Sequence, residues 1–229
     1  MSIGTLVFSR FDSGRLPGKA LRPVGGIPLL ERVLRRAQLL PWPVYLATTV
    51  KESDDALVAL ADRLGVPSYR GSEDRVLERA VLAAEGFGLD TFARLCGDRP
   101  LFPVDTLMQA AVAMQPGSAS SAALAPDLVT DNLEGGAVRG LMTEVVRTGT
   151  LRRVLEHGVS AEQQEHVTLY FYDHPDEFEI VGLDAPGTDY ACPGFAVDTE
   201  SDLANLNRIF AESPAIDLSV SEADWIYRS

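Results

Sequence analysis

The segment "GRLPGK" (14–19) has the residue types and spacing of a phosphate-binding turn. Arg15 and Lys19 supply positive charge, and two glycines let the backbone approach a ligand closely. The turn lies between an apolar run at 3–8 and an amphipathic stretch that begins at Pro28, so its N–H groups and cations can face an anion. The sequence equally allows an exposed turn whose cations bind only water. In either case an exposed Lys19 is expected to change stability by no more than about 0.5 kcal/mol when it is replaced.

Two aspartates provide the complementary chemistry. Asp98 in "RLCGDRP" and Asp198 in "FAVDTES" each follow a strand-like stretch. Carboxylate and phosphate oxygens are preferred ligands of Mg²⁺, so the pair predicts a magnesium site beside the phosphates of a nucleotide. Each aspartate also has a local explanation. Asp98 can be a turn residue before Pro100, and Asp198 or Thr199 can cap the next helix, because Thr199 and Asp202 have capping-box spacing.

Strand-like and helix-like patterns alternate over the first 114 residues. Apolar alternation predicts strands, and apolar stripes at helical spacing predict helices. The predicted strands are 3–9, 44–49, 66–70 and 91–96, and the predicted helices are 28–39, 53–64 with Ser53 as its cap, 73–87 and 104–114. This alternation is typical of an α/β fold with a mostly parallel sheet, in which ligands bind beyond the carboxyl ends of the strands.

The regular pattern breaks at about 117–190, where small residues and turn signals mix with short strand and helix signals. It returns with a strand-like segment at 195–197 and a helix over 198–210. Ser221 and Asp224 have capping-box spacing for a last short helix. We therefore predict a single domain, residues 1–229, with an insertion at about 117–190.

The distribution of charge restricts the possible partners. The 229-residue chain has a formal net charge of −13, but the first 40 residues hold seven of its 20 basic side chains and only two of its 33 acidic ones. An acidic surface repels a nucleic-acid backbone, whereas one basic loop can still bind a small polyanion. The sequence contains no signal-peptide pattern and no run of 18 apolar residues, so we expect a cytoplasmic protein with no membrane span. Cys96 and Cys192 lack metal-ligand spacing and are expected to be free thiols.

Several segments together resemble one enzyme family. They are "SRFDSGRLPGKALRPVGGIPLLERV" (9–33), "LATTVKESDDALVALADRLGVPSYRGSEDRVLERA" (46–80), "RLCGDRPLF" (94–102), "EHVTLYFY" (165–172) and "VDTESDL" (197–203). In this order they resemble the sugar-acid cytidylyltransferases, the acylneuraminate- and Kdo-activating enzymes, and most of all their spore-coat polysaccharide biosynthesis branch. The resemblance extends over nearly the whole chain.

The resemblance implies a three-layer, Rossmann-like α/β nucleotidyltransferase fold. It also implies a homodimer formed through residues near 126–175, and an enzyme of surface polysaccharide biosynthesis that transfers CMP from CTP to an acidic sugar or related acceptor, with Mg²⁺, and releases pyrophosphate. By residue, it implies catalytic roles for Lys19, Arg15 and Arg10, nucleotide contacts from Ser13, Gly14, Thr48, Thr49, Arg70, Gly71 and Ser72, acceptor contacts from Glu144, Glu165 and His166, and metal ligation by Asp98 and Asp198.

Three positions depart from the family pattern. Gly14 replaces a threonine, Arg75 replaces an acidic residue, and Met142 replaces an aspartate in the insertion. They leave open a second interpretation, a non-catalytic or altered-specificity member that acts as a nucleotide-binding or assembly module. A GTP- or sugar-1-phosphate-dependent enzyme is disfavoured, because the first loop lacks the glycine-rich sequence of such enzymes.

Overall fold

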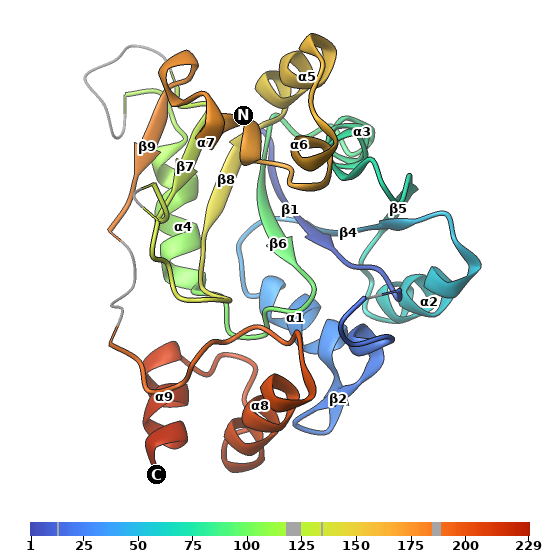
Figure 1. The fold of residues 1–229 in the computed structure, drawn as a ribbon, viewed down its shortest axis with the longest axis vertical. Coiled ribbons are helices and arrows are strands. Elements are labelled where there is room, and N and C mark those ends of the chain that lie inside the picture. The colour runs from blue at the N-terminus through green and yellow to red at the C-terminus, as the bar shows by residue number, and fades with distance from the viewer. Residues whose placement is uncertain (13, 118–124, 134, 185–188) are drawn as a thin grey trace.

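The sheet determines which loops of the protein meet. The computed structural model describes residues 1–229 except 13, 118–124, 134 and 185–188. Within those residues, seven strands form one sheet in the order β5-β4-β1-β6-β8-β7-β9 (Figure 1). Only the pairs made by β8 are antiparallel, so the other described strands of this sheet run in one direction. The strands are β1 (Ile3–Phe8), β4 (Val44–Thr49), β5 (Ser68–Gly71), β6 (Thr91–Cys96), β7 (Leu128–Thr130), β8 (Glu144–Arg147) and β9 (Ile180–Gly182).

Helices cover both faces of the sheet, and shorter elements follow several strands (Figure 1). The α-helices are α1 (Leu29–Ala37), α2 (Asp55–Arg63), α3 (Val76–Gly86), α4 (Val104–Ala113), α5 (Thr148–His157), α6 (Ala161–Glu165), α7 (Leu169–Asp173), α8 (Glu200–Glu212) and α9 (Val220–Arg228). The 3₁₀ turns are η1 (Lys19–Leu21), η2 (Glu52–Asp54) and η3 (Pro175–Glu177), and a short hairpin joins β2 (Pro23–Val24) to β3 (Ile27–Pro28).

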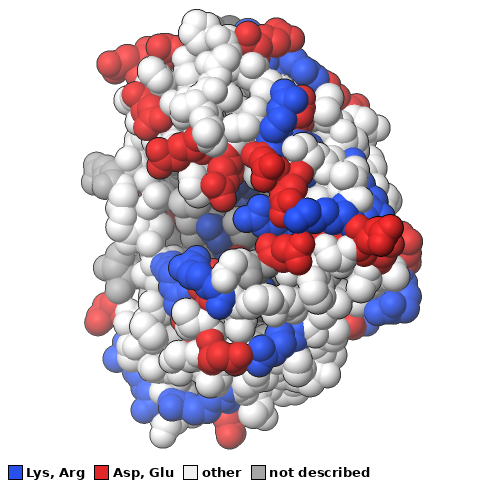
Figure 2. All heavy atoms as spheres, turned by 45° about the vertical axis from the view of Figure 1, so that its right-hand side comes forward, with Lys and Arg blue, Asp and Glu red and all other residues white. Residues whose placement is uncertain are grey.

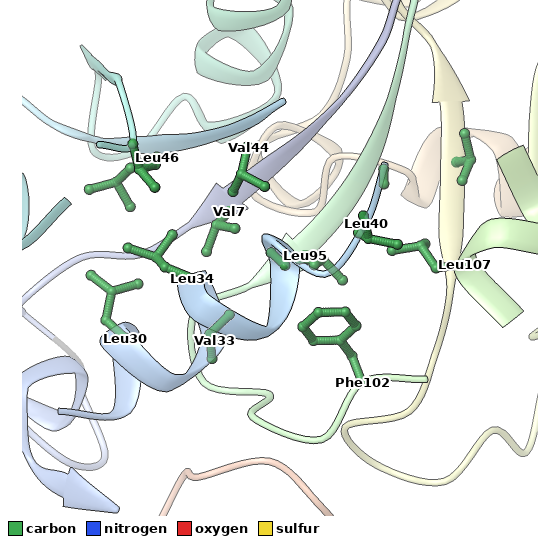
Figure 3. Close-up of a cluster of buried hydrophobic side chains, with 14 of the residues drawn as sticks. Val7, Leu30, Val33, Leu34, Leu40, Val44, Leu46, Leu95, Phe102 and Leu107 are labelled. Carbon is green, nitrogen blue, oxygen red and sulfur yellow. The ribbon is translucent and has the colours of Figure 1, made fainter. Parts of the chain in front are cut away.

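The alternation of side chains along the strands produces two cores. Successive strand residues face opposite sides of a sheet, so Val7 of β1 packs with α1, α2 and α4, while its neighbours Leu6 and Phe8 pack with α3, α5 and α7. Figure 3 shows the first of these cores, in which Leu30 and Leu34 of α1 lie against the sheet. The result is the expected three-layer α/β arrangement.

A third apolar cluster lies beyond the carboxyl ends of the central strands. It joins α8 and α9 to residues that precede the last helices, including Phe195 and Val197, and to Leu16 of the first loop. In Figure 1, α8, α9 and β2 lie together at this end of the molecule. Leu16 of the loop after β1 and Leu101 of the loop after β6 pack into this cluster, so it supports both loops.

Besides small shifts at the ends of several elements, three predicted features are wrong. Residues 195–197 are not a strand, because Phe195 and Val197 instead bond through their N–H groups to the carbonyls of Arg139 and Asp98. Ser53 is not a helix cap, since it lies within η2. The final capping box is formed by Ser219 and Glu222 rather than by Ser221 and Asp224.

The segment predicted as an insertion contributes β7, β8 and β9 to the main sheet, on the far side of β6. None of the helices in the described ranges combines the length and the apolar character needed to cross a membrane. Cys96 and Cys192 are free thiols.

Candidate active site

The loop after β1 is held in place by a buried carboxylate. Asp54 is 1 % exposed, and its Oδ1 accepts a hydrogen bond of 2.7 Å from the backbone N–H of Phe11. Its Oδ2 accepts from the hydroxyls of Thr48 and Thr49 at the end of β4. Burial acts to raise the pKa of Asp54, but these hydrogen bonds outweigh it and hold the pKa below its usual value. The loop is therefore fixed to the neighbouring strand before any ligand binds.

The turn itself closes on Gly18. Its backbone has a left-handed φ of +69°, and its N–H donates to the carbonyl of Phe11 at 3.0 Å. A side chain at this position would be strained and would lie 3.2 Å from the ring of Phe11. Lys19 begins the 3₁₀ turn that follows, so the tight turn directs its side chain toward the strand ends. Ser13 lies outside the described residues.

Lys19 connects three segments that are far apart in the sequence. Its Nζ lies 2.6 Å from Asp98 Oδ2, 3.0 Å from Asp198 Oδ1 and 2.8 Å from the carbonyl of Val197. The side chain is only 14 % exposed, so the expectation of an exposed loop cation is wrong. Burial acts to lower the pKa of Lys19, but the two carboxylates outweigh it and raise the pKa above its usual value.

The two aspartates are brought together by the backbone. The N–H of Val197 donates to the carbonyl of Asp98 at 2.9 Å, which joins the loop after β6 to the start of α8. Thr199, rather than Asp198, caps α8, and it forms the expected capping box with Asp202. Asp198 is thereby left to accept from Lys19 and to pair with Arg15 at 3.0 Å. Burial acts to raise the pKa of Asp198, yet the Lys19 contact and the nearby arginines lower it overall.

These residues line a pocket of about 430 Å³ beyond the carboxyl ends of β1 and β6. Figure 2 shows a hollow on this face of the molecule, with Lys and Arg atoms inside it and charged groups of both signs around its rim. Of the predicted site residues, the pocket brings together Arg10, Gly14, Arg15, Lys19, Asp98, Asp198, Glu165 and His166. Cations and carboxylates thus converge at the edge of the sheet where the fold class places ligands.

Six predicted site residues lie outside this pocket: Thr48, Thr49, Arg70, Gly71, Ser72 and Glu144. Thr48 and Thr49 are buried, and their hydroxyls donate to Asp54. Arg70 donates to the carbonyls of Thr49 and Lys51 and pairs with Asp55, so it braces the loop after β4.

Comparison with known proteins agrees with this geometry. Residues 5–207 match the family model described as cytidylyltransferase. The chain is 31 % identical over 232 residues to the spore coat polysaccharide biosynthesis protein SpsF of Bacillus subtilis, an alignment that covers 95 % of this chain and 90 % of the relative. The chain belongs to the cytidylyltransferase family. It is a CTP-dependent nucleotidyltransferase, as its sequence predicts, and the alternative of a non-catalytic module is not favoured.

Two other comparisons cover different parts of this cytidylyltransferase. A 3-deoxy-manno-octulosonate cytidylyltransferase of Stenotrophomonas maltophilia is 37 % identical over 122 residues, which are 51 % of this chain and 47 % of that protein. A solved structure of a cytidylyltransferase from Leptospira borgpetersenii superposes with a TM-score of 0.89 at 23 % identity and covers 100 % of this chain and 94 % of that one. The latter likeness confirms the nucleotidyltransferase fold.

Glu144 of this cytidylyltransferase lies behind the pocket rather than in it. It is 1 % exposed, and its carboxylate binds Arg94 at 2.7 Å, the Thr168 hydroxyl at 2.7 Å and the Tyr172 hydroxyl at 3.0 Å. Burial acts to raise its pKa, but Arg94 above all lowers it, so the group is a carboxylate. Glu144 therefore does not line the pocket as predicted for an acceptor-binding residue, and it contacts Arg94, which does.

Sequence reasoning missed three arginines. Arg79 and Arg94 line the pocket, and Arg139 pairs with both Asp198 and Asp202 at its edge. The alternation of side chains along β6 could have identified Arg94. It lies on the same face of the strand as Cys96, the last strand residue before the loop that contains Asp98, and both line the pocket. Arg79 and Arg139 carry no such local signal.

The departures from the family pattern do not close the cytidylyltransferase pocket. A Cβ at Gly14 would meet nothing within 4 Å, so the glycine leaves the loop open. Arg75 is exposed and pairs with Glu78 at 2.9 Å on the surface of α3. Met142 contributes its backbone carbonyl, which accepts from Arg99 at 3.3 Å.

Proposed function

We propose that this protein transfers CMP from CTP to an acidic sugar in surface polysaccharide biosynthesis, as a cytoplasmic, Mg²⁺-dependent enzyme. The convergence of Lys19 with Asp98 and Asp198 carries the proposal, because such a group binds a triphosphate and its metal ion together. Asp98 and Asp198 are also the carboxylates that the resemblance assigns to the metal.

The reaction is a displacement at phosphorus. A hydroxyl oxygen of the acceptor forms a bond to the α-phosphorus of CTP, the bond from that phosphorus to the bridging oxygen of pyrophosphate breaks, and the hydroxyl proton is lost to water. Negative charge gathers on the leaving pyrophosphate, so cations fixed beside it stabilise the transition state more than they stabilise the bound substrates. Arg15 and Lys19 are the cations that we assign to this task, and Arg10 also lines the pocket.

The donor set fits Mg²⁺. Oxygens of Asp98 and Asp198 both lie within 3.0 Å of the Lys19 ammonium, and this convergence of two carboxylates supports the proposal that they hold a cation. Among the described residues no group of three or more His, Cys, Asp or Glu could hold a metal, so phosphate oxygens and water would complete the coordination that Mg²⁺ prefers. When bound, Mg²⁺ would neutralise charge on the phosphates.

A homodimer is proposed through residues near 126–175. In the described part of the sheet this segment lies beside the edge strand β9, and Leu133 next to it is 45 % exposed. An unpaired edge and an exposed apolar side chain favour association with a second copy. A monomeric mass in light scattering at micromolar concentration would contradict the dimer.

Thermal shift with CTP, GTP, UTP and ATP, each with Mg²⁺, tests the nucleotide. A ligand at 100 times its dissociation constant stabilises a protein by about 2.7 kcal/mol, so CTP is expected to give the largest shift. Pyrophosphate release with a panel of acidic sugars then tests transfer, and the Asp98→Asn variant should need more Mg²⁺ for half-maximal release. Equal shifts with all four nucleotides would refute the CTP assignment.

A further inference from the structure

Two arginines of the pocket, Arg10 and Arg79, have little opposing charge, and a third, Arg94, is paired with Glu144 behind the pocket. The described lining contains five cations and three carboxylates, although the chain as a whole is strongly acidic. Asp98 and Asp198 are engaged by Lys19 and Arg15. The third carboxylate, Glu165, is 58 % exposed and lies 3.9 Å from Arg10. We call Arg10, Arg79 and Arg94 the arginine cluster.

Arg79, on α3, is the least compensated member of the cluster. Only 3 % of it is exposed, and its Nη1 donates to the backbone carbonyls of Ser72 and Glu73. Its Nε has no hydrogen-bond partner, and no carboxylate of the described residues forms an ion pair with it. Burial above all, together with the positive charge of Arg10, lowers the pKa of Arg79 to about 10. A buried guanidinium without a counter-ion is costly, so this one indicates an anion that the protein does not itself supply.

Arg94, on β6, is held rigidly from behind. Its Nη1 donates to Glu144 at 2.7 Å, and Glu144 is fixed in turn by Thr168 and Tyr172. Among the residues that the structure describes, none accepts a hydrogen bond from the Nε of Arg94. Because a guanidinium has five N–H donors in a planar fork, a bond to Glu144 at one end leaves others for a ligand in the pocket. Glu144 therefore positions Arg94.

The placement of the cluster distinguishes the acceptor from the nucleotide. We assigned Lys19, Asp98 and Asp198 to the phosphates and the metal above, whereas the arginine cluster is supported by α3, α6 and the Glu144 network. The attacking and leaving oxygens of a phosphoryl transfer lie roughly in line, so the acceptor approaches from the side away from pyrophosphate. A planar fork also matches a carboxylate better than a single ammonium does.

We propose that Arg79 and Arg94, with Arg10 beside them, bind the carboxylate of the acceptor. This inference rests on the proposed function, and it makes the arginine cluster the determinant that selects acidic over neutral sugars.

The test separates carboxylate binding from nucleotide binding. The protein is first saturated with Mg²⁺ and cytidine 5′-(α,β-methylene)triphosphate, which cannot transfer CMP. Calorimetry then measures the binding of 3-deoxy-manno-octulosonate and N-acetylneuraminate, each beside its uncharged methyl ester. For at least one sugar we expect the acid to bind about tenfold more tightly than the ester, the scale of a charge-assisted hydrogen bond. Arg79→Met and Arg94→Met should abolish this preference while the affinity for the nucleotide analogue stays within about threefold.

Two further variants control the experiment. Arg63→Met removes an exposed arginine of α2 outside the pocket and should leave both affinities unchanged. Arg94→Met leaves Glu144 as a buried unpaired carboxylate, so Arg94→Met/Glu144→Gln removes that charge and keeps the test valid if the single variant does not fold.

The outcomes are distinct. If the arginine variants lose affinity for the nucleotide analogue and keep the preference for the acid, the cluster binds phosphate and the inference fails. It also fails if the parent protein prefers neither acid to its ester, or if Arg63→Met has the same effect as Arg94→Met. If the parent binds an acid through the arginines but does not bind the CTP analogue, the proposed function fails while the carboxylate site stands.

Discussion

The Lys19 ammonium nitrogen lies 2.6 Å from Asp98 Oδ2, in a contact between residues 79 positions apart. The same nitrogen lies 3.0 Å from Asp198, which is 179 positions away. The first loop of the protein therefore meets its last major helix through one buried cation. This relationship links the stability of the site to the chemistry that we assign to it.

Replacing Lys19 should reduce both turnover and stability. In Lys19→Ala, loss of one preorganised cation is expected to lower turnover by about 10²- to 10³-fold. Asp98 and Asp198 would lose the cation that they share, while Asp198 would keep its pairs with Arg15 and Arg139, so the free energy of unfolding should fall by about 1–3 kcal/mol. Pyrophosphate release and urea unfolding of the same preparation measure the two effects.

Lys51→Ala is the matched control, because Lys51 is an exposed lysine of another loop that pairs with Asp12 and Glu73 outside the pocket. It should leave turnover and unfolding nearly unchanged. Parent-like turnover in Lys19→Ala would refute the role of Lys19, and parent-like unfolding would show that its buried contacts contribute little.

Asp54 should control the order of the phosphate loop without touching a ligand. Asp54→Ala leaves the N–H of Phe11 and the hydroxyls of Thr48 and Thr49 without their acceptor, at a cost of about 2–4 kcal/mol. Hydrogen exchange at the Phe11 amide should accelerate, and affinity for CTP should fall because the loop is no longer fixed.

The neighbouring variant Asp55→Ala removes a 61 % exposed carboxylate that pairs with Arg70 at the surface. It should preserve the slow exchange of Phe11. If Asp54→Ala and Asp55→Ala exchange at the same rate, the buried carboxylate does not hold the loop.

Stability should decrease at acid pH through Asp202. Burial acts to raise the pKa of this carboxyl, but hydrogen bonds from Arg139 and from the backbone of Asp198 outweigh it and hold the pKa at about 2, below the ordinary 3.8. A depressed pKa gives stability that is present above pH 4 and is lost as the pH falls toward 2. Its contribution is about 1–2 kcal/mol.

Urea unfolding of the parent and of Asp202→Asn between pH 7 and pH 2 isolates this group from other carboxylates. The stability difference between the two proteins should be constant from pH 7 to pH 5 and should shrink by about 1–2 kcal/mol between pH 4 and pH 2. A difference that does not change with pH would contradict the assignment.

Gly140 should tolerate no side chain. Its φ is +95°, and a Cβ would lie 2.4 Å from the backbone carbon of Phe195, which cannot move aside without shifting the loop before α8. We expect Gly140→Ala to cost at least about 3 kcal/mol and to disturb the contact of Arg139 with Asp198.

Gly26→Ala provides the comparison, because Gly26 has a similar φ of +85° but open space around it. It should cost only the strain of the left-handed backbone, about 1–2 kcal/mol. Equal losses in the two variants, measured by urea unfolding, would show that crowding at Phe195 is not important.

The local patterns of the sequence predicted most of the long helices and strands in the first half of the fold, but not the β2–β3 hairpin or the 3₁₀ turns. Strands β4 and β6 have the predicted boundaries, and the helices over 29–37 and 104–113 lie within the predicted ranges. Periodicity encodes these elements directly, because each side chain's face is set by its own position in a helix or strand. The strand predicted at 195–197 failed because its apolar residues pack beneath the loops without pairing in the sheet.

The sequence by itself determined the fold class and the family. It also identified the segments that meet at the pocket, which are the first loop, the two aspartates, and the segment of Glu165 and His166. Only the tertiary structure decided which charges pair within it. Lys19 lies between two aspartates, Glu144 faces inward to hold Arg94, and the Nε of Arg79 finds no hydrogen-bond acceptor in the described part of the chain. These pairings depend on the order of strands in the sheet and on the paths of loops between them. Residues far apart in the sequence acquire partners only when those paths converge, and no local period of 2 or 3.6 residues records that convergence.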